Sequence, residues 1–249
     1  MNAARDPGAT WVVGDVHGCA EELDDLLAAI APGPCDRVLF VGDLFHRGPD
    51  PLGVFDRIRA LPRAGVVLGN HELALLRRLG LAGERGDQAD AAPAEAVAGL
   101  DPTAPGALLG DRRARIAPAF AERADEVLAW LVGTPCFLEG STRGGRSWLV
   151  VHGAPPAGPL ATAPAGAFVR LRGRDDRPGS PPWYLHHAAP PFVAFGHRAS
   201  AAGPHPAPTA PTSWGLDTGC VYGGVLTALE LDGLETVAVP ARRAWVRRR

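Results

Sequence analysis

Val-Leu-Phe-Val-Gly-Asp-Leu-Phe-His-Arg-Gly, residues 38–48, is an apolar run that ends abruptly in Gly42-Asp43 and is followed in the next turn by Arg47-Gly48. A short apolar run bounded by glycine predicts a buried β-strand. An aspartate at the strand end and an arginine in the turn can together hold a metal ion and a phosphate group. Asp43 alone could also be an ordinary turn former, so this stretch needs support from the rest of the chain.

Four other places repeat this layout of an apolar run, a glycine or valine, and then a residue of a metal-ligand type. They are Asp15 with His17 after residues 10–13, Asn70 with His71 after residues 65–68, His152 after residues 147–151, and His197 after residues 192–195. Each has an ordinary explanation alone, because a lone histidine is often a core or loop residue and asparagine suits a helix N-cap. Five such strand ends in one chain are improbable by chance, and together they predict a metal site.

The chain between these strand ends alternates between strand and helix patterns. Further strands are predicted at residues 37–41, 135–138, 214–216, 225–231 and 236–239, and helices at 21–30, 51–61, 73–81, 94–100, 106–109 and 119–131. The order strand, helix, strand, helix, strand, helix in the first third predicts an α/β fold with a layered sheet. The carboxyl ends of strands in such sheets form a ligand-binding crevice, so the five strand ends can converge there.

A single domain over residues 10–240 suits the length of 249 residues. Two segments rich in alanine, glycine and proline interrupt the pattern near residues 82–118 and 154–191, and we interpret both as insertions. Residues 241–249 form an arginine-rich tail that we expect to fray.

The composition limits the class of partner. Hydrophobic residues make up 46% and charged residues 21%, as in ordinary globular proteins, and no apolar run approaches the roughly 18 residues of a membrane span. The first ten residues do not resemble a secretory signal, so we expect a cytoplasmic protein without a membrane partner. A net charge of −2 argues against nucleic acid as a partner despite local arginine clusters. The four cysteines contain no Cys-x-x-Cys pair, which disfavours a cysteine-bound zinc site.

The ligand types favour transition metals. Oxygen ligands from aspartate and asparagine combined with imidazoles suit manganese, iron, zinc or a similar ion better than a calcium cage. Six such side chains fit two ions better than one. A carboxylate such as Asp43 can bridge both.

The motifs, taken together, resemble a known family. Gly14-Asp15-Val16-His17-Gly18, Gly42-Asp43 with Arg47-Gly48, Gly69-Asn70-His71-Glu72, His152-Gly153 and Gly196-His197 resemble, in order and spacing, the phosphoprotein phosphatase family of calcineurin-like metallophosphoesterases. The block from Leu216 to Leu229 is similar to the bacterial branch, which includes serine/threonine phosphatases and symmetrical diadenosine tetraphosphatases. This resemblance implies a β-sandwich flanked by helices, with the metals at the carboxyl ends of the strands.

The resemblance also implies a division of the ligands between two divalent ions. Asp15, His17 and the bridging Asp43 would hold the first ion, and Asp43, Asn70, His152 and His197 would hold the second. Manganese is the favoured metal, with iron, zinc, nickel and cobalt as alternatives. A hydroxide shared by the ions would attack phosphorus in line.

Three further residues take roles by resemblance. His71 would protonate the leaving oxygen, and Arg47 would bind phosphate oxygens through its planar guanidinium. A second arginine usually assists from the segment after the His152 motif. We choose Arg170, with Arg172 and Arg174 as alternatives.

This chain departs from the family at two positions. His46 occupies a position where most relatives have an aspartate that orients and charges the catalytic histidine, so His71 must find support elsewhere. We therefore expect slower turnover and a shifted pH profile. Arg198 stands where relatives commonly have threonine, at the rim of the site.

Three functions remain open from the sequence. The first is a two-metal phosphoesterase acting on a phosphorylated protein or nucleotide, either phosphoserine, phosphothreonine and small phosphates or, alternatively, dinucleoside polyphosphates. The second is a weakly active or inactive binding protein on the same fold. A nuclease is the third, and the net charge and the lack of an aromatic-basic stripe argue against it.

Overall fold

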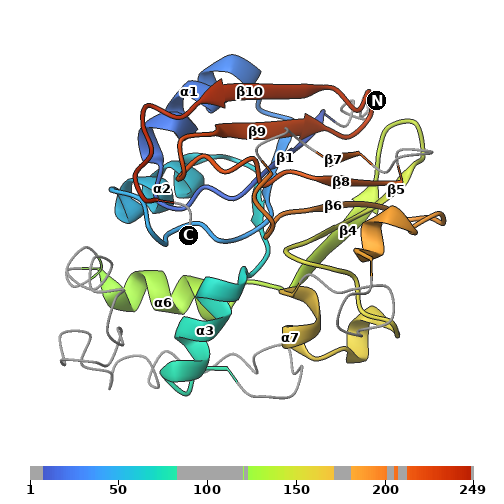
Figure 1. Cartoon of the computed structure of the whole chain (residues 1–249), viewed down its shortest axis with the longest axis horizontal. Helices are drawn as coiled ribbons and strands as arrows, with labels where there is room; N and C mark the ends of the chain where they lie inside the picture. The colour runs from blue at the N-terminus through green and yellow to red at the C-terminus, as the bar shows by residue number, and fades with distance from the viewer. Residues whose placement is uncertain are drawn as a thin grey trace, which may run out of the picture.

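Two five-stranded sheets form the centre of the computed structural model, which describes residues 8–82, 120, 123–170, 181–200, 205–206 and 212–247. The first sheet has the strand order β10-β9-β1-β2-β3 and the second the order β4-β5-β6-β8-β7 (Figure 1). The first sheet consists of β1 (Thr10–Val13), β2 (Arg37–Phe40), β3 (Ala64–Val66), β9 (Val225–Glu230) and β10 (Thr236–Pro240). The second consists of β4 (Phe137–Ser141), β5 (Ser147–Val151), β6 (Phe192–Phe195), β7 (His205–Pro206) and β8 (Ser213–Gly215).

Two sets of three strands pair in parallel. β1, β2 and β3 run parallel in the first sheet, as do β5, β6 and β8 in the second. The remaining strands join antiparallel, with β9 and β10 beside β1, β4 beside β5, and β7 beside β8. Both parallel sets carry predicted site residues in the loops that follow their strands.

Alternating side chains bury both faces of each sheet. Val12 of β1 and Leu39 of β2 face the second sheet, where Val150 and Ala194 contact the same apolar cluster. Their chain neighbours point to the opposite faces, because successive strand side chains alternate. The two sheets therefore pack as a sandwich, and the α/β fold class predicted from the sequence and its resemblance is confirmed.

Helices cover the outer faces of the sandwich (Figure 1). The α-helices in the described part of the chain are α1 (Ala20–Ile30), α2 (Pro51–Ala60), α3 (Asn70–Arg78), α6 (Ala124–Val132) and the short α7 (Ala165–Phe168). The apolar faces of the first four pack in one cluster with the outer face of the first sheet. Asp50 caps α2 by accepting the Gly53 N–H at 2.8 Å, and Pro51 suits the first helical position. Within the described residues, no helix is long and apolar enough to cross a membrane.

Helix α3 begins earlier than the apolar spacing predicts. The sequence predicts a start at Leu73, but the helix begins at Asn70, because Glu72 accepts the N–H of Gly69 at 3.1 Å and so caps the first turn. The N-cap is Gly69, so the alternative interpretation of Asn70 as an N-cap is wrong. The predicted helices at 94–100 and 106–109 lie outside the described residues.

The segment 154–191 contributes to the core where it is described. It contains α7 and two 3₁₀ turns, Leu160–Thr162 and Trp183–Leu185. Phe168 and Tyr184 pack with Phe195 of β6 on the outer face of the second sheet. The single-domain boundaries and the interpretation of this segment as an insertion stay predictions.

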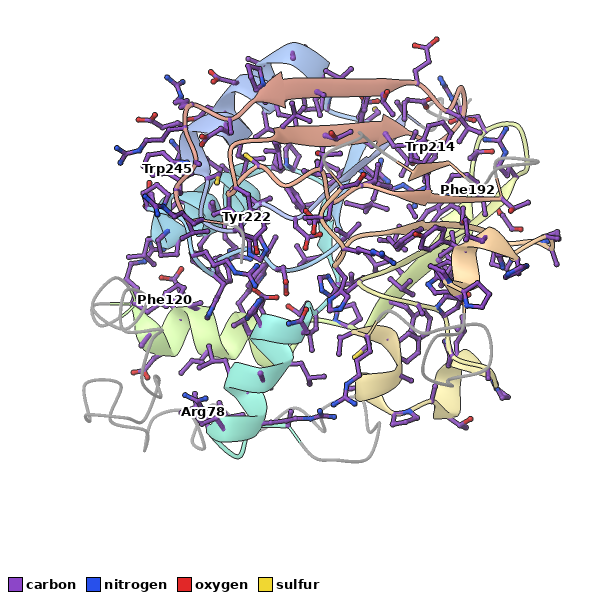
Figure 2. The ribbon with its side chains drawn as sticks, viewed as in Figure 1. Arg78, Phe120, Phe192, Trp214, Tyr222 and Trp245 are labelled. Atoms are coloured by element: carbon purple, nitrogen blue, oxygen red, sulfur yellow. The ribbon has the colours of Figure 1, made fainter. Side chains whose placement is uncertain are left out.

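The C-terminal tail is ordered against α1 over residues 241–247, so the expected fraying is wrong there (Figure 2). Glu22 of α1 accepts the Arg242 backbone N–H at 3.0 Å and the Trp245 indole N–H at 3.1 Å. The Arg242 guanidinium pairs with Asp25 at 3.0 Å. The acidic residues of α1 therefore bind the basic tail. They lie far from the tail in the sequence, so no local pattern predicts this contact.

Candidate metal centre

All six predicted ligand side chains lie at one edge of the sandwich, where the parallel strands end. Loops after the strands carry five of them, and Asn70 lies at the first position of α3. The second sheet contributes His152 and His197, and the first contributes the other four. The structure thus brings together side chains separated by up to 182 positions.

Asp15, His17 and Asp43 form the first group of donor atoms. Their ligand atoms all lie within 4.8 Å of one another, and all three residues are buried. The Nε2 atom of His17 is 3.9 Å from Asp15 Oδ2 and 3.8 Å from Asp43 Oδ2. These are the residues expected to hold the first ion.

Asn70, His152 and His197 form the second group. The Oδ1 atom of Asn70 lies 2.7 Å from His197 Nδ1 and 2.9 Å from His152 Nε2, and the two ring nitrogens are 3.1 Å apart. His152 Nε2 is also 3.5 Å from Asp43 Oδ1. Asp43 therefore directs Oδ2 toward the first group and Oδ1 toward the second, as a bridging ligand requires.

Small residues allow this close approach. A Cβ atom on Gly196 would lie 2.0 Å from Asp15 Oδ1, and one on Gly69 would lie 2.2 Å from Asp43 Oδ1. The backbone N–H of His197 donates to Asp15 Oδ1 at 3.1 Å, and that of His71 donates to Asp43 Oδ1 at 3.1 Å. The glycines of the sequence motifs thus let the backbone of one loop contact the carboxylate of another.

A backbone contact fixes the orientation of His152. Its Nδ1–H donates to the carbonyl of Val41 at 2.8 Å, which leaves Nε2 as the unprotonated nitrogen that faces Asn70 and Asp43. Burial lowers the pKa of His152 to about 4, so the ring is neutral at pH 7. Burial, followed by the nearby His152, lowers the pKa of His197 to about 4 as well. Neutral imidazoles are the form that binds metal.

The buried carboxylates repel one another. Burial, and then the charges of Asp217 and Asp43, raise the pKa of Asp15 well above its ordinary value. Burial also raises the pKa of Asp43 to about 7, although the His71 N–H and Arg47 oppose this. A divalent cation would relieve this repulsion, because it favours the ionised form of each carboxyl group.

The chemistry and the arrangement of these six side chains fit a divalent metal ion. Two buried carboxylates, one amide oxygen and three neutral imidazoles direct acceptor atoms into a small volume, where they would otherwise repel one another. The Nδ1 atom of His17 is buried without a hydrogen-bond partner in the described structure. The mixed nitrogen and oxygen donors match a transition ion, and they do not select one metal.

His71 and His46 stack beside this donor set. Their ring centroids are 4.1 Å apart at an interplanar angle of 12°, and His71 Nε2 lies 3.7 Å from Asp43 Oδ2. The structure therefore places His46 against the predicted acid. The catalytic roles of both histidines stay predictions.

Arg47 lies at the same edge, below the ring of Tyr222. Its guanidinium donates to His17 Nε2 at 2.7 Å, and its Cζ atom is 5.6 Å from the centre of the Tyr222 ring. An arginine that can contact this nitrogen can also reach an anion bound next to it.

Arg170 follows α7 and is exposed, and it lines a pocket with Asn70. Gly153 lies so close to the backbone of Arg170 that a Cβ atom would come within 2.5 Å of it, which brings the segment to the His152 loop. Arg172 and Arg174 lie outside the described residues. Arg198 is exposed, next to His197.

The sequence analysis missed two buried acids. Asp217 follows β8 in the same strand-then-acid layout as the other sites, so its pattern could have identified it, and its charge raises the pKa of both Asp15 and Asp43. Glu72 accepts the backbone N–H groups of Asp43 at 2.9 Å and Leu44 at 3.0 Å. Glu72 belongs to the Gly-Asn-His-Glu motif, and its position beside two predicted site residues could have identified it.

Comparisons with known proteins agree with this geometry. The family model described as "Calcineurin-like phosphoesterase" matches residues 9–224. Proteins named "Bis(5'-nucleosyl)-tetraphosphatase, symmetrical" from Chromohalobacter salexigens and Methylococcus capsulatus are 31% and 32% identical, over 94% of this chain in each case and 98% and 95% of theirs. A crystal structure described as that of a candidate diadenosine tetraphosphatase aligns with a TM-score of 0.69 and 25% identity, over 95% of both chains.

Proposed function

The chain belongs to the calcineurin-like phosphoesterase family and is a hydrolase of phosphate ester or anhydride bonds, and we propose that its substrate is a dinucleoside tetraphosphate, cleaved symmetrically. The observation that carries this proposal is the convergence of six donor side chains in a chain aligned over nearly the full length of symmetrical tetraphosphatases. Of the two substrate classes that the sequence leaves open, the names of the relatives favour the nucleotide.

We assign the ligands as the family resemblance implies. Asp15, His17 and Asp43 would hold one divalent ion, and Asp43, Asn70, His152 and His197 would hold the other. When bound, the two ions would activate water and neutralise charge that develops on the phosphate. Manganese is the metal we propose, because the donors combine oxygen and imidazole nitrogen.

The side chains of the chain itself bind the phosphate and move the proton. Arg47 donates to His17 Nε2, the lone pair that a bound ion would take, so in the metal-loaded protein the guanidinium would be available for phosphate oxygens. Asp43 holds the backbone N–H of His71 at 3.1 Å and so fixes that residue at the site edge. The bond that breaks joins one central phosphorus to the oxygen that bridges the two central phosphorus atoms. Water adds to that phosphorus and loses a proton to solvent, while His71 donates a proton to the departing bridge oxygen, so that one tetraphosphate gives two nucleoside diphosphates.

The test is product analysis after diadenosine tetraphosphate is incubated with protein reconstituted with Mn²⁺. Anion-exchange chromatography should show ADP alone. A mixture of AMP and ATP would contradict symmetrical cleavage. Hydrolysis of p-nitrophenyl phosphate without any cleavage of the tetraphosphate would keep the phosphatase assignment and contradict the proposed substrate.

Asp43→Asn supplies the blank, because it removes the bridging charge and keeps the size of the side chain. We expect it to lower the rate by at least about 10³-fold. The binding-protein alternative predicts a different result: a wild-type protein that takes up less than one ion per chain and shows no turnover with Mn²⁺, Ni²⁺ or Co²⁺.

A further inference from the structure

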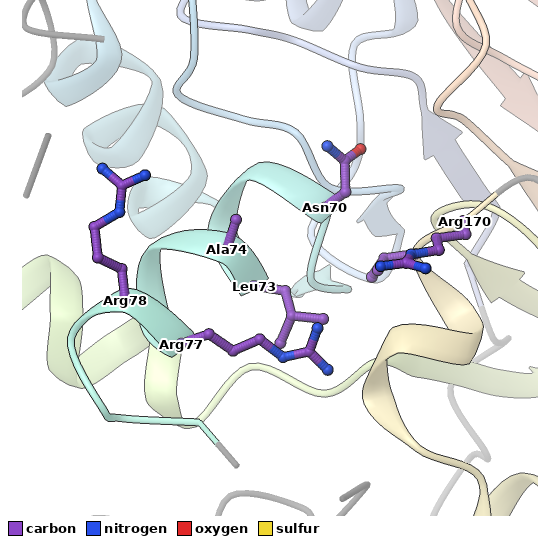
Figure 3. A pocket seen from close by; sticks show the side chains of 7 residues that line it. Asn70, Leu73, Ala74, Arg77, Arg78 and Arg170 are labelled. Atoms are coloured by element: carbon purple, nitrogen blue, oxygen red, sulfur yellow. The ribbon is translucent and has the colours of Figure 1, made fainter. Parts of the chain in front are cut away.

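A basic groove of about 520 Å³ leads away from Asn70 along α3 (Figure 3). The residues that line it are Asn70, Leu73, Ala74, Arg77, Arg78, Val169 and Arg170. Figure 3 shows Arg77 extending from α3 and Arg170 extending toward it from the opposite wall. The groove begins at a predicted metal ligand and ends among arginines.

The helical spacing explains this arrangement. Asn70, Ala74 and Arg78 follow one another at intervals of four residues, and Asn70, Leu73 and Arg77 at intervals of three and four, so both rows lie on one face of α3. Helical side chains lean toward the N-terminus, which for Arg77 is the direction of Asn70. The Cα atoms of Asn70 and Arg77 are about 10 Å apart along the helix axis. An extended arginine side chain that points toward Asn70 spans part of this distance.

Among the described residues, no acidic group neutralises the positive charge of the groove. Within the described residues, no carboxylate pairs with Arg77, Arg78 or Arg170. The Nε atom of Arg77 is buried and has no hydrogen-bond partner in the described structure. A buried donor without a partner costs stability, so contacts within the described protein do not explain the position of this guanidinium.

Stabilisation of the helix dipole is the simpler explanation for two basic residues in the last turn of α3. Helix α2 offers a comparison, because Arg57 and Arg59 also lie in its last turn. Arg57 pairs with Asp24 and Asp50, whereas Arg77 lies against Gly166 of α7, near an open groove. The dipole does not account for the buried, unpaired Nε atom of Arg77.

We propose that this groove binds the phosphates of the substrate that lie beyond the one being attacked. Arg77 and Arg78 would then select a phosphate chain over a single phosphoryl group, with Arg170 contributing a further positive charge from the opposite wall. This inference rests on the proposed function and adds to it the residues that recognise the chain. The ligand chemistry is linear polyphosphate, either free or within a dinucleotide.

Inhibition of p-nitrophenyl phosphate hydrolysis tests the groove. The metal-loaded enzyme is inhibited with orthophosphate, which fits the metal centre alone, and with tripolyphosphate, which extends into the groove. In the double variant Arg77→Ala/Arg78→Ala, the ratio of the tripolyphosphate Ki to the orthophosphate Ki should rise at least tenfold. Diadenosine tetraphosphate as a third inhibitor separates a nucleotide-bound chain from free polyphosphate.

The matched control is Arg59→Ala, which removes an exposed arginine from the last turn of α2, away from the groove. It should leave the Ki ratio within twofold of the wild-type value. Gly166→Asp keeps both arginines and adds a carboxylate next to Arg77, so it should raise the ratio in the same direction even if the double variant does not fold.

Equal changes in both Ki values, or a ratio within twofold of wild type in the double variant and in Gly166→Asp, would overturn the proposal. These results do not depend on cleavage of the tetraphosphate. An enzyme that hydrolyses p-nitrophenyl phosphate, shows the expected Ki ratio and does not cleave diadenosine tetraphosphate would contradict the proposed substrate alone.

Discussion

Several residues of the metal centre have backbone conformations that favour glycine. In the described part of the chain, six non-glycine residues have positive φ, and four of them lie at this edge: His17 at 51°, Asp43 at 49°, Arg47 at 81° and His197 at 73°. Each such residue costs roughly 1–2 kcal/mol. The protein therefore keeps these side chains at the expense of stability, which is common at functional sites.

Arg47 allows this cost to be measured. Arg47→Gly and Arg47→Ala both remove the guanidinium, so both should lower kcat/KM by about 100-fold or more. The glycine variant should be more stable than the alanine variant by about 1 kcal/mol, because only glycine accepts a φ of 81° without strain. Urea unfolding of the two variants at one pH checks this. Equal stabilities would mean that the backbone is unstrained there.

His46 illustrates what the sequence alone could show about a residue. The family comparison identified its unusual identity, but the stacking on His71 with ring centroids at 4.1 Å required the structure. Likewise, the strand-end layout predicted that the six side chains would converge, yet it could not place Arg47 against His17. Such contacts depend on side-chain directions that a linear pattern does not contain.

His46→Asp should restore a negative charge beside the predicted acid. A carboxylate favours the imidazolium form of a neighbouring histidine, so the alkaline limb of the pH–rate profile should move to higher pH. We expect kcat to rise about tenfold at pH 8. The neutral control His46→Asn should do neither. Identical profiles for both variants and the wild type would show that position 46 does not influence the acid.

At the scale of elements, Glu72 connects α3 to the loop that follows β2. Its two carboxylate oxygens accept three backbone N–H groups, from Asp43, Leu44 and Gly69. The same residue therefore caps a helix and positions Asp43, the predicted bridging ligand. This explains why the helix begins at Asn70, with two predicted site residues in its first turn.

Glu72→Gln should destabilise the protein by about 2–4 kcal/mol. Both oxygens of Glu72 accept backbone N–H groups, so the amide NH₂ of glutamine would face an N–H donor whichever oxygen it replaced. Urea unfolding measures the loss, and isothermal titration with Mn²⁺ should show weaker metal binding as the Asp43 loop relaxes. Glu139→Gln on the exposed edge of β4 is the matched control and should change neither quantity. A Glu72→Gln protein with wild-type stability would contradict this role.

The sequence predicted most strands correctly because their apolar residues alternate between two buried faces, as in Val12 and Val13. It did not predict which strands share a sheet. The pairing of β1 with β9 joins residues more than 200 positions apart, and no local signal specifies that partner. The order of the C-terminal tail was missed for the same reason, since Glu22 lies far from Arg242 in the chain.

At the scale of the whole molecule, buried ionisable groups couple stability to pH and metal. Burial, and then the charge of Asp43, raise the pKa of Glu72 to about 8, and burial raises the pKa of Asp43 to about 7. Both groups bind protons more tightly when folded, so stability falls as pH rises toward these values. His152 and His197, with a pKa of about 4 each, have the opposite effect, but only below pH 6.5.

The metal-free protein should therefore lose about 2 kcal/mol of unfolding free energy between pH 6.5 and pH 8.5, a range that lies above the one in which these histidines have their effect. Bound Mn²⁺ would keep the Asp43 carboxylate ionised and reduce this loss. Urea unfolding at the two pH values, with chelator and with Mn²⁺, measures both effects. A metal-free protein that is equally stable at both pH values would show that these carboxyl groups titrate normally.

The position of β9 beside β1 has a consequence for how the protein is made. During synthesis β1 emerges from the ribosome early. One of its edges stays unpaired until residues 225–230, which form β9, have been synthesised. Throughout that interval the nascent chain presents an apolar strand edge that can pair with another chain. Chaperone binding to partly synthesised protein should thus persist until the last strands emerge from the exit tunnel.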